Sequence, residues 1–245
     1  MKKSTYKEQL IRMIKIGICE DDVVYRKSIG KMLGHYFTEN GTSFQIKEYE
    51  SGDCFMARNE STDVLLLDIE MTGITGIELK DWLCKVDEEV KILFVTNHVE
   101  AMAEAFGKNV YGFLHKPVEQ KELEKYLARM QEDIQENRGL VIKGFDKEFV
   151  VKIRDILYFE SEDKYSRVVD KDGRHFSDKG LGQWEKELRG SHFFRCHKCY
   201  LVNFRNIHKM ESNISMCNGD KLPISRRRAK LLRDSYREYI IRKAR

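Results

Sequence analysis

The chain has 245 residues, of which 41% are hydrophobic and 34% are charged, and its formal net charge is +4. This length and apolar content fit two ordinary domains, each with its own core. No apolar run approaches the 18 residues of a transmembrane helix, and the polar, basic residues 1–12 lack the apolar centre of a secretory signal. Six dispersed cysteines fit a reducing compartment. We therefore expect a cytoplasmic protein that does not enter a membrane.

The first half alternates between strand-like and helical segments. Short apolar runs occupy residues 14–19, 64–67, 92–95 and 110–114, and segments with helical spacing occupy residues 24–37, 77–86 and 118–130. Short, β-branched or leucine-rich runs of this kind indicate buried parallel strands. The alternation predicts a doubly wound α/β domain. Because Met13 directly precedes the first run, we expect residues 1–13 to be an N-terminal extension.

Polar side chains follow these apolar runs directly. They are Glu20-Asp21-Asp22, Asp68, Thr96 and Lys116-Pro117. The carboxyl ends of parallel strands share one edge of the sheet, so these groups should meet there. Several carboxylates in one place need a cation, and a hard divalent ion such as Mg²⁺ fits. With Lys116 and Thr96 able to hold phosphoryl oxygens, Asp68 is a candidate nucleophile for phosphoryl transfer. Thr96 could instead cap the helical stretch that Asn97-His98 opens.

Residues 14–130 resemble a two-component response-regulator receiver domain. The resemblance implies that Asp68 is phosphorylated and that Lys116-Pro117 is a cis peptide bond. The other implied roles are metal ligands at Glu20, Asp21, Asp68 and the backbone carbonyl of Glu70, and switch or phosphate-binding residues at Thr96, Phe113 and Lys116. Two departures are Met71-Thr72-Gly73, where the family usually has Met-Pro-Gly, and an acidic pair that reads Glu-Asp rather than Asp-Asp.

The pattern changes near residue 139. A helical stretch over residues 128–137 should end at Arg138-Gly139. Short alternating runs follow, and turn signals at Asp172-Gly173 and Asn218-Gly219 predict hairpins. We expect a linker at residues 131–139 and a second, mostly-β domain at residues 140–245, with a short helix near residues 181–188 and a basic helix from about Arg226.

Charge is distributed unevenly along the chain. Residues 1–130 carry a net charge of −4, residues 141–190 carry none, and residues 191–245 carry +10. An imbalance this local favours a polyanionic partner, with nucleic acid ahead of a membrane surface. The tail helix carries Leu232, Tyr236, Tyr239 and Ile240 at helical spacing, which predicts a packing face rather than a recognition face.

The second half resembles the LytTR DNA-binding domain. The resemblance rests on residues 155–160, 193–203 and 222–226, and it implies a β-sandwich whose loops enter successive major grooves. It places base contacts at Tyr165, Lys198 and Arg226, of which Arg226 can bind guanine with two hydrogen bonds. The remaining candidate DNA-binding residues, which would contact the DNA backbone, are Arg195, Arg227, Arg228 and Lys230. For Arg227 and Arg228, simple solubility is an equal alternative.

Four other interpretations stay open. Cys196 and Cys199, with His208 and Cys217, have zinc-like spacing, although side chains alternate across a strand. Cys196 or Cys199 could also sense redox state. Asp68-x-Glu70 after an apolar strand resembles the nucleophile of a haloacid-dehalogenase-type phosphotransferase or phosphatase. As a separate alternative, the first half could be an unphosphorylated interaction module.

The combined hypothesis is a non-enzymatic transcriptional regulator of a two-component system. Its fold class is α/β, with a doubly wound five-stranded parallel receiver domain followed by a mostly-β LytTR domain. The expected cofactor is Mg²⁺. The expected partners are a sensor histidine kinase, promoter direct repeats of double-stranded DNA, and a second copy of the chain on phosphorylation.

Overall fold

The computed structural model describes residues 13–86, 89–144 and 147–243. Apart from Met13, the expected N-terminal extension lies outside the described residues. The chain divides into two compact units, Met1–Glu132 and Asp133–Arg245. None of the helices in the described ranges is both long enough and apolar enough to cross a membrane.

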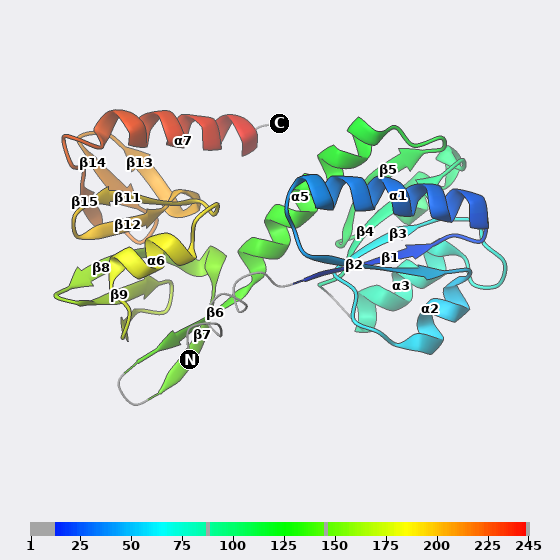
Figure 1. Ribbon diagram of the computed structural model, residues 1–245, viewed down its shortest axis with the longest axis horizontal. Coiled ribbons are helices and arrows are strands. Elements are labelled where there is room, and N and C mark those ends of the chain that lie inside the picture. Colours follow the sequence, from blue (N-terminus) through cyan, green and yellow to red (C-terminus); the bar gives the residue numbers. More distant parts are fainter. Residues whose placement is uncertain (1–12, 87–88, 145–146, 244–245) are drawn as a thin grey trace. The chain divides into compact units, whose positions relative to one another are not determined.

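The first unit contains the expected five-stranded parallel sheet (Figure 1). Its strands are β1 (Ile14–Cys19), β2 (Phe44–Tyr49), β3 (Val64–Leu67), β4 (Lys91–Thr96) and β5 (Val110–His115). Their order in the sheet is β2-β1-β3-β4-β5, and every neighbouring pair is parallel. Every residue of β3 and β4 is buried, as expected of central strands that are covered on both faces.

Helices cover both faces of this sheet. They are α1 (Val23–Glu39), α2 (Gly52–Arg58), α3 (Gly76–Val86), the 3₁₀ turn η1 (Val99–Ala101), α4 (Met102–Ala105) and α5 (Gln120–Asn137). Figure 1 shows α1 and α5 on one face and α2 and α3 on the other. Asp22 begins α1, because its carboxylate accepts the N–H groups of Val24 and Tyr25 at 2.8 and 3.1 Å. The helix predicted to end at Arg138-Gly139 does so, since α5 finishes at Asn137.

The second unit is mostly β, as predicted. Its elements are β6 (Gly139–Lys143), β7 (Glu148–Lys152), η2 (Ile153–Asp155), β8 (Ile156–Glu162), β9 (Tyr165–Asp170), β10 (Arg174–Ser177), α6 (Leu181–Glu187), β11 (Phe193–His197), β12 (Tyr200–Asn203), η3 (Phe204–Asn206), β13 (Ile207–Met210), β14 (Asn213–Met216), β15 (Lys221–Pro223) and α7 (Ala229–Lys243). An antiparallel sheet has the order β10-β9-β8-β12-β11, a second sheet has the order β13-β14-β15, and β6 pairs with β7. Asp172-Gly173 and Asn218-Gly219 occupy hairpin turns, as expected.

Two hydrophobic clusters pack against the five-stranded sheet of the second unit. One joins it to the three-stranded sheet and α7, and the other joins it to α6 and the β6–β7 hairpin. On α7, Leu232 and Tyr239 are buried, whereas Ile240 is 46% exposed. The prediction that Ile240 packs was therefore wrong, because one residue turns the helix by about 100° and carries Ile240 past the buried face. The helix also begins at Ala229 rather than at Arg226.

The last turn of α5 is anchored within the second unit. The carboxylate of Glu136 is buried and forms ion pairs with Arg205, with Lys243 at 3.3 Å and with His192 at 3.5 Å. The side-chain oxygen of Asn137 accepts a hydrogen bond from the guanidinium of Arg154. This end of the helix is thus held by partners from widely separated parts of the sequence.

Candidate functional site

Three carboxylates meet at the carboxyl edge of the parallel sheet. Glu20 follows β1 and Asp68 follows β3, and the register pairs Cys19 with Leu67, so the next residues lie side by side. Oxygen atoms of Glu20, Asp21 and Asp68 all lie within 4.8 Å of one another. Glu20 and Asp68 are only 2% and 7% exposed, whereas Asp21 is exposed. The predicted acidic group is therefore brought together, and most of it is removed from water.

Lys116 supplies the positive charge at this edge. It follows β5, and its Nζ lies 2.6 Å from Glu20 Oε2 and 2.6 Å from Asp68 Oδ2. The Lys116–Pro117 peptide bond is cis, as expected. Burial raises the pKa of Glu20 above its usual range, although the hydrogen bond from Lys116 acts to lower it. Burial lowers the pKa of Lys116, but hydrogen bonds to Asp68 and Glu20 outweigh it and leave a net rise.

The charge at the site fits a divalent cation. Three carboxylates and one ammonium group leave an excess of negative charge in a largely buried place, and carboxylate oxygens are the ligands that Mg²⁺ prefers. Asp21 Oδ2 also accepts the N–H of Thr72 at 3.3 Å, which ties the Met71-Thr72-Gly73 loop to the acidic pair. The side-chain carboxylate of Glu70 contacts His98, with its Oε2 atom 2.9 Å from Nε2 of that residue.

The two predicted switch residues lie on β4 and β5. Thr96 is fully buried, and its hydroxyl accepts the N–H of His98 at 3.0 Å, so it also caps the turn that precedes η1. Phe113 stacks on Phe94, with ring centroids 5.4 Å apart and planes 7° apart. The rings of Phe106 and Phe113 meet edge to face, with their centroids 5.0 Å apart. Thr96 and Phe113 therefore belong to strands that end at the edge of the sheet where the carboxylates meet.

The predicted base-contacting residues all lie in or beside turns of the second unit. Tyr165 begins β9 after the β8–β9 turn, Lys198 lies in the β11–β12 turn, and Arg226 lies in the turn before α7. The last two turns are adjacent, because the N–H of Ser225 donates to the carbonyl of Cys196 at 3.0 Å. The ring of Tyr165 packs against Phe176 at 5.2 Å.

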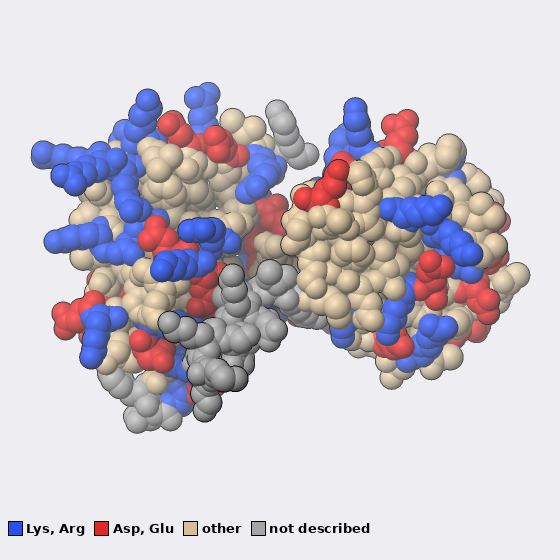
Figure 2. Space-filling model, in the orientation of Figure 1, with Lys and Arg blue, Asp and Glu red and all other residues tan. Residues whose placement is uncertain are grey.

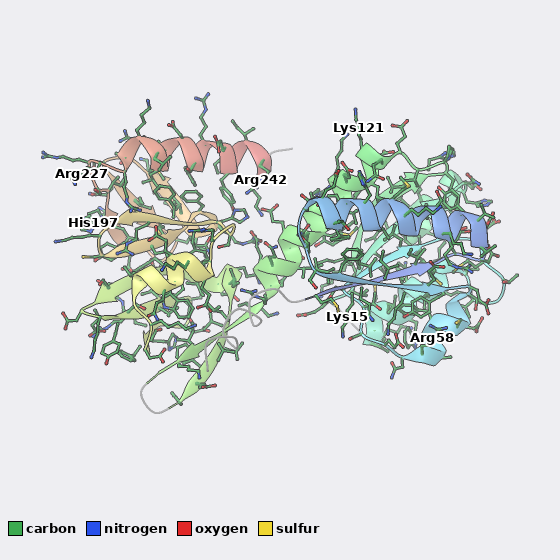
Figure 3. The ribbon with its side chains drawn as sticks, in the orientation of Figure 1. Lys15, Arg58, Lys121, His197, Arg227 and Arg242 are labelled. Carbon is green, nitrogen blue, oxygen red and sulfur yellow. The ribbon has the colours of Figure 1, made fainter. Side chains whose placement is uncertain are left out.

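Basic side chains gather at this end of the second unit. Figure 2 shows lysine and arginine concentrated over α7 and the neighbouring strands β14 and β15. Figure 3 shows His197 and Arg227 at the same end of the unit. Within the described ranges, no ion pair involves the side chains of Lys198, Arg226, Arg227 and Lys230. These four cations are therefore available to a polyanion.

Two of the arginines predicted to contact the DNA backbone donate hydrogen bonds to loop carbonyls of the protein. Arg195 donates from Nε to the carbonyl of His197 at 3.0 Å and also to the carbonyl of Lys198. Arg228 donates from Nη1 to the carbonyl of Arg195 at 3.0 Å. Both guanidinium groups also pair with Glu185, at 3.6 and 3.5 Å. They shape the loop that carries Lys198.

Two family models match the chain and together span most of it. The response regulator receiver domain matches residues 16–128, and the LytTr DNA-binding domain matches residues 146–237. The chain is a LytTR response regulator. The alternative of a haloacid-dehalogenase-type phosphotransferase or phosphatase is not supported, because its candidate nucleophile, Asp68, lies within the residues that match the receiver domain.

Relatives of this LytTR response regulator align over nearly their whole length. An uncharacterized response regulatory protein of Yersinia pestis is 29% identical over 240 residues, which cover 91% of this chain and 98% of that protein. The transcriptional regulatory protein BtsR of Escherichia coli is 25% identical, covering 91% and 99%. The solved LytTr DNA-binding domain of a putative methyl-accepting/DNA response regulator from Bacillus cereus is 25% identical, with a TM-score of 0.37, and covers 40% of this chain and 94% of that one.

All six cysteines of the LytTR response regulator lie within the described residues, and none of them forms a disulfide there. Among the described residues, two groups of side chains are close enough to share a metal ion, and neither contains a cysteine. Cys196 is buried, and burial raises the pKa of its thiol to about 12. The geometry therefore gives no support to the zinc interpretation or to a reactive Cys196.

One contact of the LytTR response regulator was missed by sequence reasoning. The ring centroid of Tyr25 lies 4.6 Å from Nζ of Lys116, and the Tyr25 hydroxyl accepts the N–H of Val118 at 3.0 Å. Nothing in the spacing marks Tyr25, because the contact joins the start of α1 to the end of β5. Asp22, by contrast, could have been identified as a cap, since it directly precedes a helical run.

Proposed function

We propose that Asp68 of this LytTR response regulator accepts a phosphoryl group from a sensor histidine kinase, and that this event controls promoter binding by the second domain. The observation that carries the proposal is the position of Lys116, whose Nζ lies 2.6 Å from both Glu20 and Asp68 in a group of three carboxylates. The chain that holds this group also matches a DNA-binding family. The receiver would span residues 14–130 and the DNA-binding domain residues 140–245, with residues 131–139 joining them.

The residues of the site divide the chemistry of transfer among them. A carboxylate oxygen of Asp68 forms a bond to phosphorus as the bond from phosphorus to the histidine nitrogen of the kinase breaks. Glu20, Asp21, Asp68 and the carbonyl of Glu70 would hold Mg²⁺, which would neutralise the phosphoryl oxygens. Lys116 needs only a small displacement from Asp68 Oδ2 to bind a phosphoryl oxygen.

The signal would leave the site through Thr96 and Phe113. In the structure, the Thr96 hydroxyl accepts the N–H of His98. When this hydroxyl turns to donate to the new phosphoryl oxygen, the loop that follows β4 should therefore move with it. Phe113 stacks on Phe94 of the neighbouring strand, so its packing responds to movement of β4. The expected consequence is pairing of two chains on direct repeats in DNA.

At the DNA, the cations without ion pairs and the two arginines that bind loop carbonyls would have different roles. Arg226 would bind guanine through two hydrogen bonds, Lys198 would bind guanine or a phosphate, and Tyr165 would stack or contact a thymine methyl. Arg227 and Lys230 would contact phosphates. Arg195 and Arg228 would act through the loop that carries Lys198, which they brace. We place this activity in the cytoplasm, in keeping with six unpaired cysteines.

DNA binding with and without a small acyl phosphate plus Mg²⁺ tests the proposal. Fluorescence anisotropy on the promoter upstream of the protein's own gene, at fixed salt, should show tighter binding after phosphorylation in the wild type and no change in Asp68→Asn. Binding that ignores the phosphodonor would refute phosphorylation control.

The assigned base contact has its own test. Arg226→Ala should weaken promoter binding by about 5- to 150-fold, equivalent to ~1–3 kcal/mol, while leaving phosphorylation of Asp68 intact. Arg237→Ala is the matched control, because it removes the same charge from an exposed position of α7. Equal losses in both variants would reduce the role of Arg226 to net charge.

A further inference from the structure

Tyr25 lies against the lysine of the site without belonging to the set of charged groups. It is the third residue of α1, the helix that begins directly after the acidic residues that follow β1. Its ring centroid lies 4.6 Å from Nζ of Lys116, which is within the range of a cation–π interaction. Its hydroxyl accepts the N–H of Val118 at 3.0 Å. One side chain therefore contacts both the ammonium group of Lys116 and the backbone two residues beyond it.

The lysine needs such support because of its chemistry. A lysine side chain is a point charge on a flexible stem of four carbons, and ordering that stem costs rotamer entropy. Lys116 must nevertheless hold its ammonium group 2.6 Å from both Glu20 and Asp68 and then follow a phosphoryl oxygen. An aromatic face beside the ammonium group limits where the stem can go, whichever anion the ammonium group contacts.

The hydroxyl of Tyr25 acts on the backbone. Val118 follows the Lys116–Pro117 bond at the end of β5, and proline has no N–H of its own to fix this turn. The hydrogen bond from Val118 to Tyr25 connects the turn to α1. The ring thus contacts the ammonium group of Lys116, and the hydroxyl restrains the main chain two residues after Lys116.

We propose that Tyr25 is a positioning residue for Lys116, and that it tightens the binding of a phosphoryl group at Asp68 without contacting that group. The inference rests on the proposed function, since it assumes that Asp68 is the acceptor. It assigns a role in phosphoryl acceptance to a residue outside the acidic, hydroxyl and lysine set.

Three variants separate the contributions. Tyr25→Leu removes both the ring and the hydroxyl, and Tyr25→Phe keeps the ring but removes the acceptor for Val118. A cation–π contact near a partly buried lysine corresponds to about a fivefold change in affinity, so Tyr25→Leu should bind the phosphoryl analogue about fivefold more weakly. Tyr25→Phe should retain most of the affinity. Val24→Ala, at a 74% exposed position on the same turn of α1, is the matched control.

The experiment measures two affinities in the full-length protein. Beryllofluoride in the presence of Mg²⁺ reports the phosphoryl site, and Mg²⁺ alone reports the carboxylates. Because Tyr25 contacts Lys116 and not the carboxylates, Tyr25→Leu should weaken beryllofluoride binding and leave Mg²⁺ binding unchanged or tighter. The initial rate of phosphorylation by acetyl phosphate should fall in parallel with beryllofluoride affinity.

Each other result overturns the inference. Beryllofluoride affinity in Tyr25→Leu within twofold of wild type would show that Lys116 needs no such support. An equal loss of Mg²⁺ and beryllofluoride binding would show general damage to the site rather than positioning of Lys116. A wild-type protein that takes neither beryllofluoride nor a phosphoryl group would overturn the proposed function itself, and the inference with it.

Discussion

Replacing Lys116 by methionine should destabilise the first domain strongly, and Mg²⁺ should reverse much of the loss. The ammonium group of Lys116 lies 2.6 Å from the carboxylates of both Glu20 and Asp68, whose side chains are only 2% and 8% exposed. Removing one partner of a buried ion pair costs about 3–5 kcal/mol, because the remaining charge is buried without compensation. The Lys116 side chain keeps 14% exposure, so we expect about 3 kcal/mol, the low end of that range.

The loss should depend on pH in a defined direction. Burial already raises the pKa of Glu20, and Lys116 opposes that rise. In Lys116→Met the folded-state pKa of Glu20 should rise further above its unfolded value. The folded state then binds the proton more tightly than the unfolded state, so the variant should lose stability as pH rises through the interval between the two pKa values. Below the unfolded pKa, the contribution of Glu20 to the difference from wild type should vanish.

Mg²⁺ should act in the variant as a replacement cation. A ligand present at 100 times its dissociation constant stabilises the folded state by about 2.7 kcal/mol, which nearly matches the expected loss. Mg²⁺ should also bind Lys116→Met more tightly than wild type, since no ammonium group competes for Glu20 and Asp68.

Amide hydrogen exchange followed by mass spectrometry is the appropriate assay, because a two-domain chain does not unfold in one step. Peptides from β1, β3 and β5 should lose protection in Lys116→Met without Mg²⁺ and regain it with Mg²⁺, while peptides from the second domain serve as an internal control. Lys121→Met, at an exposed position of α5, is the charge-matched control. The same loss with and without saturating Mg²⁺ would refute the reasoning.

Further predictions concern the second domain. In the native protein at pH 8, exposed Cys217 should react with a thiol reagent, whereas Cys196 should stay unmodified because burial raises the pKa of its thiol to about 12. Rapid labelling of Cys196 in the native protein would contradict its burial. Trp184→Phe should cost about 2–3 kcal/mol in urea unfolding of this domain, because the fully buried indole N–H donates to two serine hydroxyls. The hydrogen bond from Tyr158 holds the pKa of Asp220 below its usual range, so wild type should lose stability as pH falls from about 4 through that lowered pKa. Asp220→Asn should lack this acid-dependent loss, and unfolding curves of equal pH dependence would reject the interpretation.

The sequence predicted the mainly apolar strands of the parallel sheet, including the edge strand β5, better than the strand that alternates polar and apolar residues. β1, β3, β4 and β5 stand out as continuous apolar runs, whereas β2 alternates polar and apolar residues, and its residues were not identified as a strand. The three-stranded sheet was equally inconspicuous, because its strands are three or four residues long and mix polar with apolar residues, whereas β3 has the same short length but is wholly apolar.

At the site, the sequence could predict which charged groups share an edge but not where each one points. The carboxylates and Lys116 follow strands, and strand order brings them together. The hydrogen bonds of Arg195 and Arg228 depend on loop carbonyls whose orientation no local pattern specifies. The contact of Tyr25 with Lys116 depends on the packing of α1 beside the end of β5, across 91 residues of sequence.

The anchoring of Glu136 and Asn137 has a practical consequence for exchanging receivers between relatives. A polypeptide beginning at residue 140 would leave Arg205 and Lys243 without their carboxylate, whereas one beginning at Asp133 keeps the whole set. A receiver from another protein should therefore be spliced within α5, upstream of Asp133.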